Sequence, residues 1–140
     1  MSSNLKKIIN FWAPPLIWGA LIFSVSSTSV PQVSTSYTVD FTLHKLAHII
    51  EYAILGILVY RALKEENISR KEAVIYAIII AAFYGFTDEF HQSFTPHRTT
   101  RLRDVIIDTI GATAGILIVW KLLPKMPKRL LNWAKKLGLL

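Results

Sequence analysis

The sequence predicts an all-α membrane protein, a bundle of four transmembrane helices followed by a basic amphipathic C-terminal segment. Of its 140 residues, 52% are hydrophobic and only 18% are charged, whereas soluble domains usually carry about 25% charged residues. Four mostly apolar stretches approach the roughly 20 residues that a membrane-spanning helix needs, and they cover residues 8–27, 44–63, 72–92 and 105–123. They occupy more than half of the chain, so no separate soluble domain is expected.

The first stretch contains the pair Pro14-Pro15, and proline disfavours helical geometry at its own position and at the residue before it. We therefore expect residues 4–13 to lie at the inner membrane surface before the chain turns into the bilayer. The stretch also has features of a secretory signal peptide, with a cleavage site at residues 24–26. It is longer than the usual apolar core of about 7–15 residues and contains prolines, so we expect a retained helix.

The net charge of +7 is distributed as in a multi-pass membrane protein. Basic residues precede the first stretch at Lys6 and Lys7 and flank the connection 64–71, whereas the connection 28–43 contains no lysine or arginine. Because cytoplasmic loops carry the excess of Lys and Arg, we predict a cell-membrane protein with both termini in the cytoplasm. The excess of basic residues is therefore explained by membrane topology, and no nucleic-acid partner is expected.

The third connection departs from this rule. It should lie outside the cell, yet it carries Arg98, Arg101 and Arg103. Close pairing with carboxylates would offset these charges, so we expect Arg98 in particular to pair with an acidic residue at a neighbouring helix end.

The chain divides into a four-helix membrane domain, residues 1–124, and a tail, residues 125–140. In the tail, basic residues alternate with apolar ones and no acidic residue occurs. This pattern is typical of an amphipathic segment on the anionic inner leaflet. The chain has no cysteine, so neither disulfides nor thiolate chemistry is available.

Polar residues recur on the second helix at helical spacing. His44, His48, Glu51 and Leu55 share one stripe, and Glu51 lies about 10 Å below the outer end at a rise of 1.5 Å per residue. A carboxylate at that depth should face the bundle interior with a partner. It is either part of a functional site or a structural ion pair or protonated glutamate.

The third and fourth helices add further carboxylates near the same membrane surface. Tyr84, Asp88 and Gln92 share a stripe of the third helix, with Glu89 beside it. On the fourth helix, Asp104 and Asp108 share a face with the glycines and alanine of 111–115, a small-residue pattern that lets another helix approach closely. Both aspartates should therefore point into the bundle.

The ordered combination of these motifs resembles the VanZ-like family over residues 8–120. The motif positions in this chain are His44-Lys45, His48, Tyr52, Leu55-Gly56, Tyr84-Gly85, Asp88-Glu89, Gln92, Pro96, Arg98, Asp104, Gly111-Ala112 and Gly115. The family's namesake is an accessory protein of glycopeptide-resistance gene clusters, linked to low-level teicoplanin resistance. The resemblance gives weight to Lys45, His48, Tyr52, Asp88, Glu89, Gln92, Arg98 and Asp104. The chain departs from the family pattern at His44, His97 and Asp108, where Asp, Gly and Asn are usual.

We therefore predict a cell-envelope protein with an outward-facing polar pocket that binds a lipid-linked cell-wall precursor or a glycopeptide. The pocket residues would be Lys45, His48, Glu51, Tyr52, Tyr84, Asp88, Glu89, Gln92, Arg98, Asp104 and Asp108. An arginine would hold phosphate or carboxylate in a bidentate manner, and the carboxylates would accept hydrogen bonds from hydroxyls and amines. No cofactor is identified.

Two alternatives remain open. The first is an intramembrane enzyme acting on a lipid-linked substrate, because bundle metal sites combine His and carboxylates on facing helices, and the candidate ligands are His48, Glu51 and Asp88. The second is a small proton-coupled transporter, which would require a homodimer. The crowding of polar residues at one end of the helices argues against a path across the membrane.

Overall fold

The computed structural model describes residues 3–28, 34–95 and 100–140. Within these residues the protein is all helical and has no strands. The helices are α1 (Ser3–Ser26), α2 (Tyr37–Lys64), α3 (Arg70–Gln92), α4 (Leu102–Leu117) and α5 (Lys128–Lys136), with a π-helical turn (Ile118–Leu122) and a 3₁₀ turn (Leu123–Lys125) after α4. The predicted fold class is thus confirmed.

Four helical segments are long and apolar enough to cross a membrane, as predicted: Leu5–Ser26, Tyr37–Lys64, Arg70–Gln92 and Leu102–Lys125. Their outward faces are apolar, with Leu16, Ile50 and Phe83 each more than half exposed. Such large exposed apolar surfaces are unusual in soluble monomers, whereas lipid tails would cover them here. The chain is therefore a multi-pass membrane protein.

The prediction that the chain turns at Pro14-Pro15 is wrong, because α1 is one helix that continues through both prolines. Pro14 has no N–H to donate to the carbonyl of Asn10, its partner one turn earlier. The Nη1 of Arg61, on α2, donates to that carbonyl oxygen instead, at 3.0 Å. Prolines are tolerated in transmembrane helices where neighbouring groups satisfy the freed carbonyls in this way.

The second helix begins at Tyr37, earlier than the predicted start at His44. Asp40 lies in its first turn, where a negative charge is favourable, and its Oδ1 accepts a hydrogen bond from the backbone N–H of Ser34 at 3.2 Å. Helix α3 begins with a capping box, in which Ser69 Oγ accepts from the N–H of Glu72 and Glu72 Oε2 accepts from the N–H of Ser69. These local bonds fix the helix starts.

Glycines let α2 and α4 pack backbone to backbone. A Cβ added at Gly111 would lie 2.5 Å from the carbonyl oxygen of Ile49, and one at Gly115 would lie 2.6 Å from that of Ala53. The small-residue face of α4 therefore packs against α2, close to the residues that carry the predicted site.

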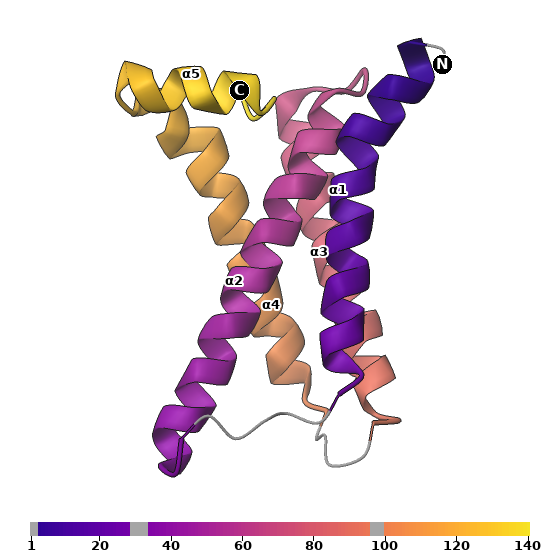
Figure 1. Ribbon diagram of the computed structural model, residues 1–140, viewed down its shortest axis with the longest axis vertical. Coiled ribbons are helices and arrows are strands. Elements are labelled where there is room, and N and C mark those ends of the chain that lie inside the picture. Colours follow the sequence, from indigo (N-terminus) through magenta and orange to yellow (C-terminus); the bar gives the residue numbers. More distant parts are fainter. Residues whose placement is uncertain (1–2, 29–33, 96–99) are drawn as a thin grey trace.

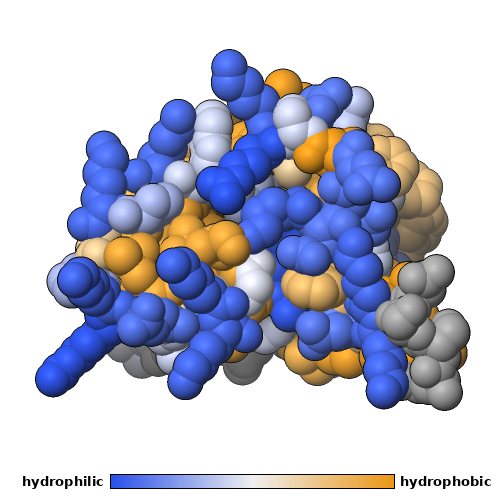
Figure 2. Space-filling view, turned by 90° about the horizontal axis from the view of Figure 1, so that it is seen from above, coloured by the Kyte–Doolittle hydropathy of each residue, from blue (hydrophilic) through white to orange (hydrophobic). Residues whose placement is uncertain are grey.

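The two ends of the bundle differ. Both chain termini and the α2–α3 connection lie at one end, with α5 lying across it (Figure 1). We call this the terminal end, and the opposite end, where α1 and α3 finish and α2 and α4 begin, the carboxylate end. Figure 2 looks onto the terminal end and shows hydrophilic side chains over much of it, with apolar ones between them. The arrangement places the basic N-terminal, 64–71 and 125–140 segments together.

Candidate functional site

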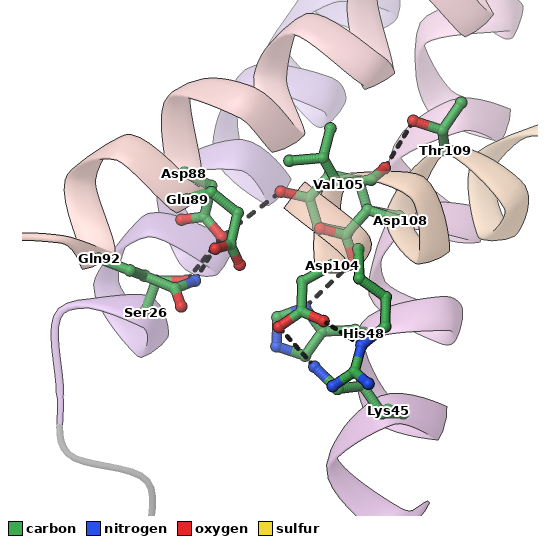
Figure 3. Close-up of polar contacts among 12 residues, drawn as sticks. Ser26, Lys45, His48, Asp88, Glu89, Gln92, Asp104, Val105, Asp108 and Thr109 are labelled. Carbon is green, nitrogen blue, oxygen red and sulfur yellow. Dashed lines mark hydrogen bonds and ion pairs between the residues drawn. The ribbon is translucent and has the colours of Figure 1, made fainter. Parts of the chain in front are cut away.

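A cluster of buried polar side chains lies at the carboxylate end (Figure 3). Asp88 is 2% exposed and Asp108 is 1% exposed. The other buried polar residues are Ser26, Glu89, Gln92 and Asp104. Burying a carboxylate is costly unless hydrogen bonds or charges compensate it, so the partners of each group determine what the cluster can do.

Asp88, on α3, joins three helices through one oxygen. Its Oδ2 accepts from Ser26 Oγ of α1 at 3.0 Å, from Gln92 Nε2 at 2.9 Å and from the Tyr52 hydroxyl of α2 at 3.4 Å. Gln92 Nε2 also donates to Ser26 Oγ at 3.3 Å. Asp88 is thus the centre of a hydrogen-bonded network that joins α1, α2 and α3.

Two pairs connect α2 to α4, one turn apart. Lys45 Nζ lies 2.7 Å from Asp104 Oδ2, and His48 Nδ1 lies 3.1 Å from Asp108 Oδ1. Arg103 Nε lies 3.7 Å from the other oxygen of Asp104. Both helices run from the carboxylate end to the terminal end. A step of about one turn on each, three residues on α2 and four on α4, therefore brings the second pair together.

Glu89 connects α3 to the start of α4. Its Oε2 accepts a hydrogen bond from the backbone N–H of Arg101 at 2.9 Å, the residue that precedes α4. Of the three arginines of this connection, Arg101 therefore contacts a carboxylate through its backbone and Arg103 through its side chain. Arg98 and His97 lie outside the described residues, so the expected pairing of Arg98 stays a prediction.

Three buried carboxylate oxygens have no hydrogen-bond partner within the described part of the chain: Asp88 Oδ1, Asp104 Oδ1 and Asp108 Oδ2. They belong to α3 and α4, which face each other across the cluster (Figure 3). A Cβ added at Gly85 would make ordinary contacts, 3.4 Å from the Tyr52 ring and 3.6 Å from Asp108 Oδ2, so α3 lies close to both residues here. An ionised carboxylate only accepts hydrogen bonds, and the cluster therefore suits a ligand that donates them.

Other predicted site residues have structural contacts. The Tyr84 hydroxyl donates to the carbonyl of Gly19 at 2.6 Å and so holds α1 against α3. Glu51 is partly buried, and its backbone carbonyl accepts from Trp18 Nε1 at 2.9 Å. His44 Nδ1 lies 2.7 Å from the carbonyl oxygen of Asp40, within α2.

The metal alternative concerns His48, Glu51 and Asp88. Among the described residues, no three His, Asp or Glu side chains are grouped so that they could hold a metal ion. His48 instead contacts Asp108, and Asp88 accepts hydrogen bonds from hydroxyl and amide groups. The cluster in this structure is organised by hydrogen bonds and ion pairs.

Sequence reasoning missed the contribution of α1. Ser26 belongs to the Asp88 network, and Ser27 Oγ lies 3.0 Å from His91 Nε2. The available signal was the group of serines at positions 24, 26 and 27, which ends the first apolar stretch at the same membrane surface as the carboxylates.

An apolar cavity of about 490 Å³ adjoins the network. It lies between α1, α2 and α3, and its lining includes Leu16, Gly19, Phe23, Leu55, Ile80 and Tyr84. Tyr84 connects the cavity to the Asp88 network. Its ring centroid lies 6.3 Å from that of Tyr52, whose hydroxyl donates to Asp88. At the carboxylate end, the ring of Phe23 stacks on His91 with centroids 4.1 Å apart.

Comparison with known proteins gives one family. A family model described as VanZ/LLP1 matches residues 3–124. No curated protein and no solved structure matches the chain. The match covers α1 to α4 and ends before α5.

Proposed function

Because the chain belongs to the VanZ/LLP1 family, we propose that it is a cell-envelope protein that binds the polar head group of a lipid-linked or glycopeptide-type ligand. We further propose that this binding contributes to glycopeptide resistance of the teicoplanin type. The observation that carries the proposal is the set of three buried aspartate oxygens, on Asp88, Asp104 and Asp108, that have no hydrogen-bond partner within the described residues.

The chemistry of these oxygens selects the ligand class. Sugar hydroxyls and ammonium groups donate hydrogen bonds, and bonds to a charged acceptor are the stronger ones, each contributing about 1.5–3 kcal/mol. Lys45 lies beside Asp104 and His48 beside Asp108, and both offer donors to a phosphate or carboxylate of the ligand. Arg98 is proposed to add a bidentate donor. A ligand with hydroxyls, amines and an anionic group would match this set.

The apolar cavity supports a ligand that also carries a hydrocarbon chain. The cavity lies in the membrane-spanning part of α1–α3 and adjoins the Asp88 network through Tyr84 and Tyr52. Its volume of about 490 Å³ lies within the range of roughly 300–1,000 Å³ that is usual for small-molecule sites. A polar head at the aspartates and an apolar chain in the cavity would together describe a lipid-linked precursor or a lipoglycopeptide.

The experiment compares Asp88→Asn with wild type in a glycopeptide-sensitive Gram-positive host. Teicoplanin susceptibility is measured, together with the amount of protein in the membrane. Glu66→Gln is the matched control, since it removes one carboxylate at the terminal end and keeps an acceptor for Trp12 Nε1, which bonds Glu66 Oε1 at 3.0 Å. We expect Asp88→Asn to lose more resistance than any fall in its abundance explains, and Glu66→Gln to keep the resistance.

Binding is measured directly with the purified protein in lipid nanodiscs and teicoplanin as the probe. We expect Asp88→Asn to weaken binding at least tenfold. Equal binding and equal resistance in Asp88→Asn and wild type would contradict the proposal, as would wild type without any resistance or binding.

A further inference from the structure

A second apolar cavity, of about 400 Å³, lies at the terminal end between α1, α2 and the residues after α5. It is separate from the carboxylate end and from the cavity beside it. Its lining includes Pro14, Ile54, Ile57, Leu58, Arg61 and Leu137. Arg61 is the charged residue of a lining that is otherwise almost entirely apolar.

Arg61 is held in place by backbone groups and a ring. Its Nε donates to the carbonyl of Leu137, its Nη1 donates to that of Asn10 at 3.0 Å, and its guanidinium lies 4.5 Å from the centroid of Phe11. None of the carboxylates in the described residues forms an ion pair with it. These bonds leave further guanidinium donors, so a fixed positive charge stands beside an apolar cavity.

Helix α5, which ends one residue before Leu137 of the cavity lining, brings further positive charge to the terminal end. It carries Lys128, Arg129, Lys135 and Lys136, and residues 125–140 contain no acidic side chain. Lys135 and Lys136 directly precede Leu137, whose carbonyl binds Arg61. The apolar side chains of Trp133 and Leu130 on the same helix are 60% and 47% exposed, and the helix lies across the end of the bundle (Figure 1). Charged and apolar groups therefore meet where lipid head groups would meet acyl chains.

We propose that this cavity binds one anionic phospholipid from the leaflet on the side of the chain termini. One acyl chain would lie along Pro14, Ile57 and Leu58, and the phosphate would accept hydrogen bonds from Arg61, with Lys135 and Lys136 beside it. A guanidinium is well suited to bind phosphate, and basic groups near an anionic membrane surface gain affinity from its negative potential. The proposal is independent of the ligand of the carboxylate end.

The test is native mass spectrometry of the full chain in detergent with either phosphatidylglycerol or phosphatidylcholine added. We expect one retained phosphatidylglycerol per chain and at least tenfold weaker retention of phosphatidylcholine. Arg61→Gln should abolish this preference, whereas Arg70→Gln, at the same end but outside the cavity lining, should leave it unchanged.

Because Arg61 also satisfies the carbonyls of Asn10 and Leu137, a second variant avoids these bonds. Leu58→Trp fills the cavity without removing a charge, and Ile75→Trp adds the same bulk at an exposed position of α3. We expect Leu58→Trp to lose the retained lipid and Ile75→Trp to keep it. The proposal would be overturned if wild type retained both lipids equally, or if Leu58→Trp retained the lipid as wild type does. It would also be overturned if wild type were a dimer that Leu58→Trp dissociates, because the cavity would then bind a second copy of the chain.

Discussion

The two ends of this bundle differ in whether their charged side chains are buried or exposed. At the carboxylate end, acidic side chains are buried between helices and contact partners on other helices, as Asp88 does with Ser26 and Tyr52. At the terminal end, most basic side chains are exposed, and Arg61 and Lys7 donate to backbone carbonyls. Exposed charges keep their hydration, whereas buried ones depend on a specific set of partners.

This difference predicts where substitutions matter. Exposed surface charges can usually be replaced within about 0.5 kcal/mol. Removing one partner of a buried pair costs about 3–5 kcal/mol, because the other charge remains uncompensated. The carboxylate end should therefore be sensitive to single changes, and the terminal end should tolerate them with Arg61 as the exception.

The largest expected effect is all-or-none and concerns the orientation of the two ends. We predict that the carboxylate end faces outward and both termini face the cytoplasm. The chain has no cysteine, so single cysteines can be introduced cleanly. Ser34→Cys and Ser93→Cys should react with a membrane-impermeant maleimide in intact cells, and Asn67→Cys should react only after the membrane is opened. Labelling of Asn67→Cys alone in intact cells would reverse the orientation.

The next effect compares a lysine from each end. Lys45→Met removes the closer of the two cationic partners of Asp104, whose side chain is 10% exposed, and leaves only Arg103 at 3.7 Å. It should lower the free energy of unfolding by up to about 3 kcal/mol. Lys71→Met, at an exposed position of the terminal end, should change it by less than about 0.5 kcal/mol. Reversible unfolding of the purified protein in mixed micelles measures both. Equal effects would show that burial does not distinguish the two ends.

A smaller effect is expected where α2 and α4 meet. Gly111→Ala would place its Cβ 2.5 Å from the carbonyl oxygen of Ile49, so the helices must move apart, at a cost of about 1–3 kcal/mol. Gly19→Ala is the control, since its nearest contact would be an ordinary 3.5 Å to Tyr84. Thermal unfolding measures the difference, and a Gly111→Ala protein as stable as Gly19→Ala would show that the close approach is not needed.

Helical spacing predicted part of the buried carboxylate set. Asp104 and Asp108 were expected to face the bundle interior, and the structure buries both. Glu51 was expected to face it too but is only partly buried. Spacing within one helix identifies its inward face, because the period of the helix is fixed. The number of membrane-spanning helices followed from length and hydropathy for an equally local reason.

Contacts between distant residues could not be predicted in this way. The helical path through Pro14 depends on Arg61, which is 51 residues from the Asn10 carbonyl that it satisfies. The Asp88 network depends on Ser26, 62 residues away. Nothing local to either segment indicates such a partner, so the sequence led to a turn at the prolines and left α1 out of the site.

The smallest expected effect tests this missed contribution of α1. Ser26→Ala removes one donor to Asp88 Oδ2 and one acceptor of Gln92 Nε2. A hydrogen bond to a charged group contributes about 1.5–3 kcal/mol, and two further donors remain on the same oxygen, so we expect a loss of about 1.5 kcal/mol in unfolding free energy. Ser24→Ala is a matched control on the same helix, because Ser24 Oγ donates to the backbone carbonyl of Ala20, one turn earlier in α1.

The combination of Ser26→Ala with Asp88→Asn decides whether the two residues act as one unit. Groups that share a network give effects that do not add, with interaction energies of about 0.5–3 kcal/mol. We therefore expect the double variant to be at most about 0.5 kcal/mol less stable than Asp88→Asn alone. If Ser26→Ala costs as much in the Asp88→Asn background as in wild type, then α1 merely packs beside the cluster. Teicoplanin susceptibility of the same four proteins, measured at equal abundance, then shows whether the network that stabilises the fold is also the one that binds the ligand.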